Sequence, residues 1–186
     1  LILILTLSFQ TLTKADDIKD FEIEGMSIGD SLLDFMKKKD IDSKKVYFKS
    51  KIGIKKEYSS LFIDRNNLDN FDDVRIYFKS IDKSYVMESI AGYKYFQNDI
   101  ENCKSFKKSI VYDVSIVAKN STKKEYPNYK LTGSDGTRYM TVFSFRDSSA
   151  IKAICYDYKS DTFKDRFTLI IETPDWRNFQ KHRAFK

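Results

Sequence analysis

The sequence is poor in the residues that most often bind metals or act as catalytic bases. It contains a single histidine, His182, and two cysteines, Cys103 and Cys155, which lie far apart in the chain. Structural zinc sites typically use four cysteine or histidine ligands, so this composition leaves almost no material for one. A catalytic cysteine needs a base beside it, and neither cysteine has a histidine nearby in the sequence. We therefore expect no metal site, no cofactor and no thiol-dependent catalysis.

Arginine and charge of one predominant sign are also lacking. The 33 basic residues are mostly lysines, and 27 acidic residues are interspersed with them, which leaves a formal net charge of +6. Lysines scattered in this way do not form a positive stripe that could follow a phosphate backbone. The sequence therefore predicts that nucleic acid is not a partner.

Long hydrophobic runs are absent except at the front of the chain, which reads "LILILTLSF". At about nine residues this run is too short to span a bilayer. Small and polar residues follow it, with Thr13 and Ala15 placed where a signal peptidase reads small side chains before Asp16. We interpret residues 1–15 as a signal peptide truncated at its front, since it lacks an initial Met and a basic start. The residue directly after Ala15 is Asp16 and not a cysteine, so we expect no lipid anchor.

The mature chain, residues 16–186, is therefore expected in the periplasm or outside the cell, with no transmembrane segment. In such an oxidising compartment an even number of cysteines favours pairing. We predict a disulfide between Cys103 and Cys155, with two separate buried thiols as the alternative.

The sequence does contain enough apolar material for one folded domain. Hydrophobic residues make up 41% of the chain and aromatic residues 15%, as in globular proteins. A first helix is predicted from Ser27 to Lys38, where Ser27 followed by Asp30 fits a helix N-cap. The clearest amphipathic pattern runs from Asp99 to Ala118, with Asn98 as the expected N-cap.

Short alternating runs of aromatic and β-branched residues predict strands on either side of the second helix. They are separated by turns too short for parallel crossovers, so we expect antiparallel pairing. Residues 120–136 are interpreted as a polar loop. The strands are expected at 46–50, 57–63, 73–80, 85–95, 137–145, 150–158 and 166–173.

The predicted fold class is therefore α+β, in the order α-β4-α-β3. We expect two layers, an antiparallel meander with two main helices packed on one face. Each half reads as one helix followed by a meander, which suggests an internal duplication. Cys155 shares a strand face with Ile151 and Ala153 and can point at the helix that carries Cys103.

Two esterase-like motifs overlap near the front of the mature chain. Gly25 to Gly29 fits G-x-S-x-G, but too few residues precede Ser27 to build the strands that a nucleophile elbow requires. Gly29 to Leu32 spells G-D-S-L and resembles the motif of a hydrolase family named after it. That resemblance implies Ser31 as nucleophile and His182 as base, with Asp175 as the nearest acid.

The remaining pattern of that family is missing, because Phe179 and Phe96 stand where it has an aspartate and a glycine. A glycine turn followed by a Ser27 helix cap explains the same stretch without chemistry. We keep a small secreted esterase as the alternative function.

Three stretches, "DFEIEGMSIGDSLLDFM", "IAGYKYFQNDIENCKSFKKSI" and "AICYDY", resemble a group of small exported proteins from AT-rich marine alphaproteobacteria of the Pelagibacter type. The resemblance implies export, supports the cysteine pairing and carries no activity with it. The sequence thus favours a non-enzymatic periplasmic or secreted protein, a binding or envelope-associated module. Its partner is expected to be an envelope protein or a small ligand.

Overall fold

The structure is a computed structural model, and it describes residues 17–47, 57–64, 68–131, 135–159 and 163–184. It has an α+β fold built on one large antiparallel sheet, in agreement with the predicted class. The predicted signal peptide, residues 1–15, lies outside the described residues. No helix in the described ranges is long and apolar enough to cross a membrane.

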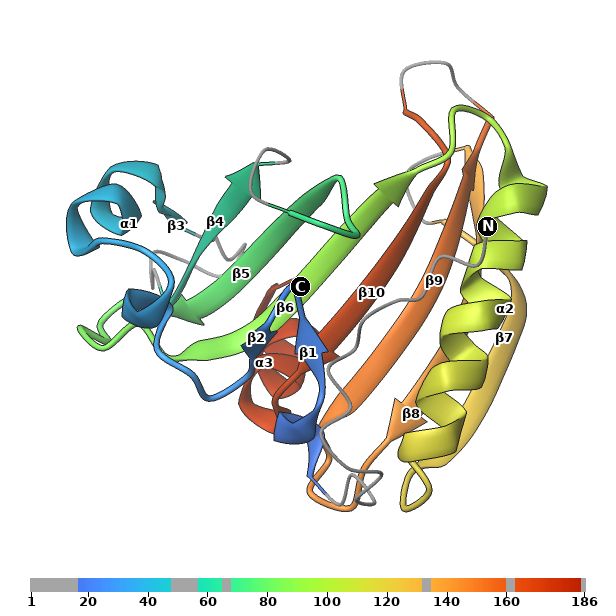
Figure 1. The fold of residues 1–186 in the computed structure, drawn as a ribbon. Coiled ribbons are helices and arrows are strands. Elements are labelled where there is room, and N and C mark those ends of the chain that lie inside the picture. Colours follow the sequence, from blue (N-terminus) through green and yellow to red (C-terminus); the bar gives the residue numbers. More distant parts are fainter. Residues whose placement is uncertain (1–16, 48–56, 65–67, 132–134, 160–162, 185–186) are drawn as a thin grey trace.

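The eight-stranded sheet consists of two four-stranded meanders placed side by side (Figure 1). Along the sheet the order is β3-β4-β5-β6-β10-β9-β8-β7, so the last strand of each meander lies in the centre, where β6 pairs with β10. All pairs are antiparallel. The strands are β3 (Val46–Tyr47), β4 (Tyr58–Asp64), β5 (Asp73–Lys79), β6 (Met87–Tyr95), β7 (Thr122–Lys130), β8 (Gly136–Ser144), β9 (Ala150–Tyr158) and β10 (Arg166–Glu172).

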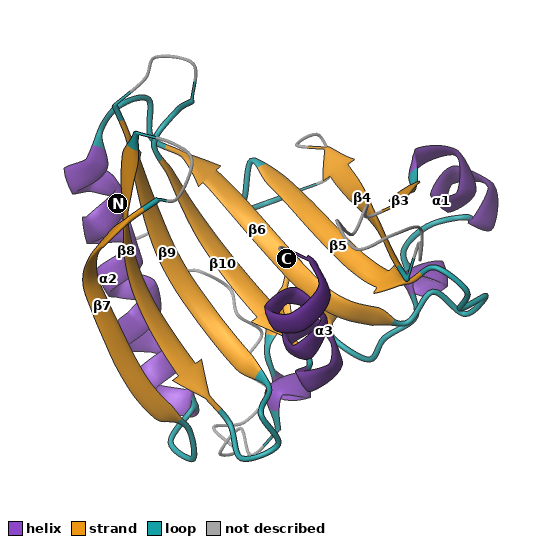
Figure 2. Cartoon of the chain, turned by 180° about the vertical axis from the view of Figure 1, so that it is seen from behind, coloured by secondary structure: helices purple, strands orange, loops and turns teal. Residues whose placement is uncertain are grey.

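The predicted two-layer arrangement, with two main helices on one face of the sheet, is not confirmed, because the first of these two helices does not form. The long helix α2 (Ile100–Val117) packs on β9 and β10 on one face, whereas α3 (Pro174–Phe179) lies on the opposite face (Figures 1 and 2). Trp176 holds α3 there, because its ring stacks on Tyr77 of β5 at 4.3 Å between ring centroids.

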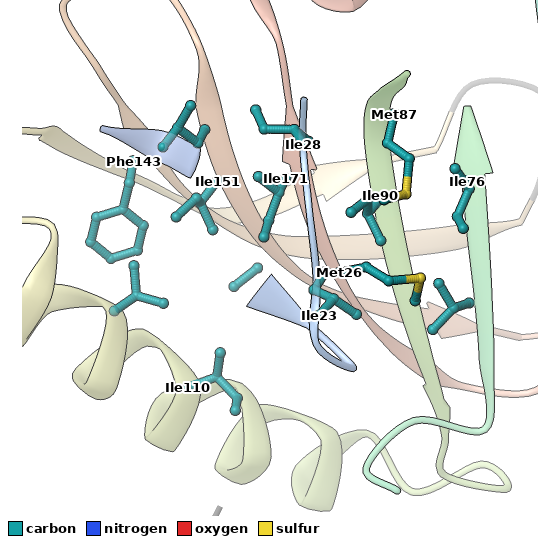
Figure 3. Close-up of a cluster of buried hydrophobic side chains, with 14 of the residues drawn as sticks. Ile23, Met26, Ile28, Ile76, Met87, Ile90, Ile110, Phe143, Ile151 and Ile171 are labelled. Carbon is teal, nitrogen blue, oxygen red and sulfur yellow. The ribbon is translucent and has the colours of Figure 1, made fainter. Parts of the chain in front are cut away.

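The main core lies between the sheet and α2. A short hairpin of β1 (Glu22–Ile23) and β2 (Met26–Ser27) covers the sheet next to the helix and contacts β6. Figure 3 shows how isoleucines, methionines and Phe143 from these elements fill the space. The buried members that it labels are Ile23, Met26, Ile28, Ile76, Met87, Ile90, Ile110, Phe143, Ile151 and Ile171.

A disulfide joins α2 to the sheet, in agreement with the predicted cysteine pair. Cys103 in the first turns of α2 bonds to Cys155 on β9, with 6.0 Å between their Cα atoms. Both side chains are completely buried. The bond lies in the interface that the strand pattern of Ile151, Ala153 and Cys155 indicated.

The helix predicted from Ser27 to Lys38 does not form. Gly29 has a φ of +93°, a left-handed conformation that interrupts a helix. The backbone around it pairs with β6 instead, since Gly29 N–H donates to the Met87 carbonyl and Met87 N–H donates to the Asp30 carbonyl, both at 2.9 Å. Ser27 therefore lies in β2 and caps no helix. The helical part of this segment reduces to a 3-10 turn, Leu32–Asp34, and to α1 (Lys38–Lys44).

Two further differences concern the second half of the chain. The N-cap of α2 is Asp99, whose Oδ1 accepts from the Asn102 N–H at 3.0 Å, whereas Asn98 precedes it with a φ of +64°. The predicted loop at 120–136 contains β7, a strand on the edge of the sheet. Its register shifts between Tyr126 and Tyr129, where Pro127 lies. A proline is tolerated there because edge strands and bulges leave backbone N–H groups unpaired.

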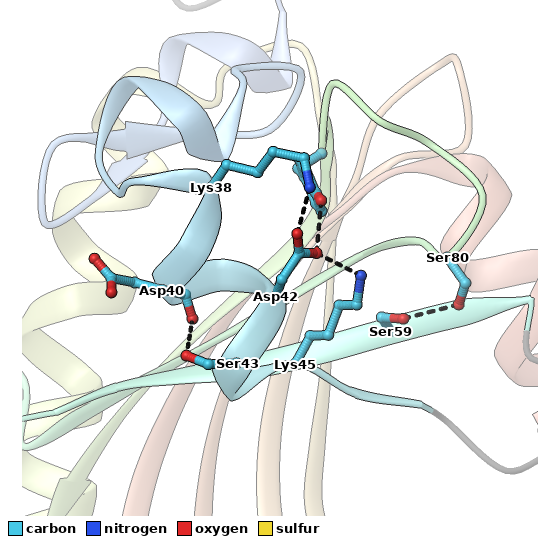
Figure 4. A network of polar contacts seen from close by, with 8 residues as sticks. Lys38, Asp40, Asp42, Ser43, Lys45, Ser59 and Ser80 are labelled. Carbon is cyan, nitrogen blue, oxygen red and sulfur yellow. Dashed lines mark hydrogen bonds and ion pairs between the residues drawn. The ribbon is translucent and has the colours of Figure 1, made fainter.

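The short helix α1 is fastened to the rest of the fold by a polar network around Asp42 (Figure 4). Its carboxylate accepts from Lys38, from Lys45 at 2.7 Å and from the hydroxyl of buried Tyr85 at 2.8 Å. These hydrogen bonds, the one from Lys38 first, hold the pKa of Asp42 well below its usual range. Charge and hydrogen bonding thus replace the apolar stripe that α1 lacks.

Candidate functional site

Ser31 has a structural role in its local surroundings. Its hydroxyl donates to the Ser84 carbonyl at 2.6 Å and accepts from the Leu33 N–H at 3.2 Å, which caps the 3-10 turn. Its backbone forms a bridge with Val86, next to the start of β6. The serine is therefore engaged on both sides in holding the N-terminal segment against the sheet.

His182 lies elsewhere, in a π-helical turn that follows α3. It lines an open cleft of about 570 Å³ on the α3 side of the sheet, and Ser31 is not among the lining residues. Asp175, the acid of the esterase alternative, is exposed and pairs with Lys79 at 2.7 Å. Within the described parts of the chain, no hydrogen bond or ion pair joins Ser31, Asp175 and His182. The cleft is lined by Ser148, Lys152, Pro174, Arg177, Asn178, Gln180, Lys181 and His182.

A buried cluster of charged side chains lies next to this cleft. Glu172 at the end of β10 is fully buried and pairs with Lys152 at 2.6 Å and with Arg177 at 3.2 Å. Burial raises the pKa of Glu172, and the two cations oppose that shift. Arg177 also donates to the carbonyls of Ser148 and Ser149. These partners link α3 to the β8–β9 turn, so we interpret this cluster as structural.

The more unusual surface is the rest of the sheet face that carries α3. Side chains alternate along each strand, so the positions between the core residues point to this face. Figure 2 shows that α3 and the π-helical turn after it, Gln180–Ala184, cover one part of it near the end of β10, and that α1 and α2 do not lie over it. At the opposite end, where β6 ends and β10 begins, the alternating positions are occupied by tyrosine and arginine.

Five of these side chains form a row across five adjacent strands, which we call the tyrosine–arginine ladder. Tyr95 on β6 lies directly opposite Arg166 on β10, and Arg166 lies opposite Tyr156 on β9. Tyr156 lies opposite Arg138 on β8, which in turn lies opposite Tyr129 on the edge strand β7. The row therefore alternates tyrosine and arginine without interruption and runs perpendicular to the strands.

Ring stacking holds the two guanidinium groups of the ladder in place. The Cζ atom of Arg166 is 5.0 Å from the ring centroid of Tyr156, and that of Arg138 is 4.4 Å from the centroid of Tyr129. Arg166 also lies 5.4 Å from the ring of Tyr93, the neighbour of the ladder on β6. Such cation–π contacts contribute roughly 0.5–1 kcal/mol each at exposed sites and more when water is excluded.

These two arginines have no counter-ion in the described structure. Neither takes part in an ion pair with a described residue, and the Nε atoms of both are buried without a hydrogen-bond acceptor. Asp73, which lies opposite Tyr93 on the neighbouring strand β5, accepts from the Tyr95 hydroxyl at 2.9 Å. The ladder thus presents two oriented, half-buried cations that form no ion pair with any residue that the structure describes.

Tyr93, Tyr95 and Tyr156, which lie beside these arginines, stay neutral at physiological pH. Burial raises the pKa of Tyr156 and, more strongly, that of Tyr93. Burial and the hydrogen bond to Asp73 raise the pKa of Tyr95 to about 12. Their hydroxyls are therefore hydrogen-bond donors, and those of Tyr129 and Tyr156 have no partner among the described residues.

The rim of the ladder adds exposed apolar surface. Phe163 is 53% exposed, and its ring centroid lies 5.3 Å from that of Tyr158. Tyr158 in turn stacks on Tyr156. Tyr129 is 49% exposed. A surface of aromatic rings with unpaired arginines is typical of binding sites, where these residue types are enriched.

The described ranges contain no group of three or more His, Cys, Asp or Glu side chains arranged to hold a metal ion. Comparison of the chain with protein-family models, with curated proteins and with solved structures found no match. The candidate site therefore rests on geometry alone.

The ladder was not predicted, although the sequence contains a signal for it. The predicted disulfide depends on the positions of β9 that face α2, such as Cys155, and the alternate positions point to the other face. Those positions carry Tyr156 and Tyr158, and the matching positions of the neighbouring strands carry Arg138 and Arg166. The outward-facing strand positions thus contained a signal, because Arg75, Arg138 and Arg166 all occupy positions on the face away from α2.

Proposed function

We propose that this chain is a non-enzymatic periplasmic or secreted binding module and that the tyrosine–arginine ladder is its binding surface for an anionic ligand. One observation carries the proposal: Arg138 and Arg166 are oriented by aromatic rings and have no counter-ion among the described residues. A half-buried charge without a partner is costly in a stable fold, and an acidic ligand would compensate for it.

The envelope assignment is supported by two features. The front of the chain has the pattern of a signal peptide, and the structure contains a buried disulfide, which is common in exported proteins. The resemblance to exported Pelagibacter-type proteins agrees with this compartment. An envelope protein or a small ligand remains the expected partner, and nucleic acid does not.

Titration with poly-L-glutamate, a simple carboxylate polymer, tests whether the ladder binds anions. NMR shifts should move at Arg138, Arg166 and Tyr156 and should weaken as salt is added, because exposed charge pairs are screened. The double variant Arg138→Gln/Arg166→Gln should lose the response. Arg146→Gln, a change at an exposed arginine outside the ladder, is the matched control and should behave like the wild type.

Two results would overturn this proposal. Unchanged binding by the double variant would place the site elsewhere, and preferred binding of a single-stranded oligonucleotide would contradict the expected partner class.

One comparison distinguishes the esterase alternative from the binding module. Hydrolysis of p-nitrophenyl esters should be no faster than the buffer rate, for both the wild type and Ser31→Ala, since the Ser31 hydroxyl is engaged with Ser84. Turnover that depends on Ser31 would show that the protein is an enzyme and would refute the binding-module proposal.

We also infer an internal duplication, because each half contributes one four-stranded meander whose last strand is central in the sheet. If so, a two-fold rotation about an axis between β6 and β10 should superpose the β4–β6 hairpins on the β8–β10 hairpins in an experimental structure. Strand directions or lengths that fail to superpose would argue against common origin.

A further inference from the structure

We propose that the tyrosine–arginine ladder docks an acidic segment of a partner protein in the polyproline II conformation, with carboxylates three residues apart. This inference rests on the proposed binding function and narrows its ligand from any anion to one kind of peptide. It is carried by the spacing of the two arginines, by the hydroxyls between them and by the direction of the row.

The spacing of the cations selects the conformation of the ligand. Arg166 and Arg138 lie in register on β10 and β8, separated by one strand, so their backbones are two strand spacings, roughly 9.6 Å, apart. A polyproline II helix repeats every three residues with a rise of about 3.1 Å per residue, which places every third side chain on the same side about 9.3 Å apart. Carboxylates at such positions match both arginines.

Other peptide conformations fit less well. In an extended strand, side chains on one side are roughly 6.6 Å or 13 Å apart. In an α-helix, positions seven residues apart are about 10.5 Å apart, which is close to the arginine spacing. A helix, however, uses its own backbone carbonyls, whereas a polyproline II segment leaves them free to accept hydrogen bonds.

The tyrosines favour a ligand with free backbone carbonyls. The hydroxyls of Tyr156 and Tyr129 lack partners in the described structure, and Tyr156 lies between the two arginines. A tyrosine hydroxyl at that position can donate to a carbonyl of the docked segment while the flanking arginines hold its carboxylates. Aromatic surfaces are the usual docking sites of polyproline II segments, since proline rings pack on aromatic rings.

The ends of the ladder agree with a linear ligand. The row crosses five strands, so it extends roughly 19 Å, about the length of six residues of polyproline II. Phe163 and Tyr158 provide apolar surface beside it for the residues between the carboxylates. Guanidinium groups fixed by stacking can form two parallel hydrogen bonds to each carboxylate, which a lysine cannot.

Binding of four synthetic peptides, measured by calorimetry or fluorescence anisotropy, tests the proposal. (Glu-Pro-Pro)4 should bind at least about tenfold more tightly than (Gln-Pro-Pro)4, which has no charge, and than (Glu-Pro)6, in which the spacing is wrong. An alanine-rich helical peptide with glutamates seven residues apart should also be at least about tenfold weaker.

The variants locate the effect on the protein. Arg138→Gln and Arg166→Gln should each weaken (Glu-Pro-Pro)4 binding by at least about tenfold, and Arg146→Gln should leave it unchanged. Arg138→Lys keeps the charge and removes the planar fork, so a loss of affinity in this variant shows that the fork is required. Unchanged circular dichroism and unfolding temperature confirm that each variant is folded. Wild-type affinity of a folded Arg138→Gln variant would refute the docking site.

The outcomes distinguish this inference from the proposed function on which it rests. If poly-L-glutamate binds at the ladder and (Glu-Pro-Pro)4 has no preference over the other acidic peptides, the polyproline II proposal is wrong and the anion-binding function stands. If an acidic polysaccharide such as polygalacturonate binds and no peptide does, the ligand is not a protein segment. If neither peptides nor polymers bind, both proposals fall.

Discussion

Glu172 shows how a single carboxylate can determine the attachment of a helix. It is fully buried, yet it ends the central strand β10 and pairs with Lys152 on β9 and with Arg177 on α3. Desolvation disfavours its charged form and raises its pKa, and the two cations oppose that shift. Such clusters depend on every member being present, because a remaining buried charge has no other partner.

Replacing Glu172 with glutamine is therefore expected to destabilise the protein strongly. The change keeps the shape and leaves Lys152 and Arg177 without a counter-ion, so the free energy of unfolding should fall by about 3 kcal/mol. Urea unfolding measures this. Glu125→Gln, a change in the exposed pair with Lys123, should cost less than about 1 kcal/mol. An equal, small effect of both changes would contradict the importance of the buried cluster.

Asp42 should make the stability of the protein depend on pH at the acid end of the range. Its pKa is lowered in the folded protein, so its contribution to stability is present above the unfolded pKa near 3.8 and is lost as the pH falls through the lower folded pKa. The urea midpoint of the wild type should fall more steeply below about pH 4 than that of Asp42→Asn. Measuring both midpoints from pH 7 to pH 2 decides this, and identical curves would show that the network in Figure 4 does not form in solution.

At the level of elements, the disulfide fixes α2 to the sheet. Cys103 and Cys155 are 52 residues apart in the sequence, and closing a loop of that length stabilises a protein by about 4 kcal/mol in the chain-entropy model. Reduction should lower the urea midpoint and increase amide exchange in α2 before β4 and β5. Two titratable thiols in unfolded, unreduced protein would show that the bond is not formed.

The elements that the sequence predicted correctly are those with a strong repeating pattern. The stripe of Cys103, Ile110 and Val114 identified α2, and alternation identified β5. Periodicity failed for Ser27 to Lys38, because the turn at Gly29 and the backbone bonds to β6 outweigh local helix preference. It also failed for β7, whose lysine-rich edge sequence has no buried face to reveal it.

The candidate site was harder to predict from the sequence than the fold was, for a related reason. A ladder depends on the register of five strands, and the central pair, β6 and β10, comes from distant parts of the chain. No local pattern around Tyr95 indicates that Arg166 lies beside it. Alternation along each strand predicts which side chains lie on the outer face, but it does not predict which of them are neighbours on adjacent strands.

At the scale of the whole molecule, the proposed export predicts where the mature chain begins. Cleavage after Ala15 should give periplasmic protein that begins at or close to Asp16. Intact mass of the protein recovered from the periplasm checks this. A mass that still includes residues 1–15 would rule out cleavage at that point.

The central pairing of β6 with β10 also sets an order of events during folding. Tyr95 and Arg166 are neighbours in the sheet although 166 − 95 = 71 positions separate them. A chain that emerges from its N-terminus can complete the first meander early, but the edge of β6 stays open until β10 has been made. Pairings this distant in sequence form slowly, and an open central strand attracts other chains. The nascent protein is thus most vulnerable to aggregation just before β10 is made, and the pairing of β10 with β6 is the step that closes the entire sheet.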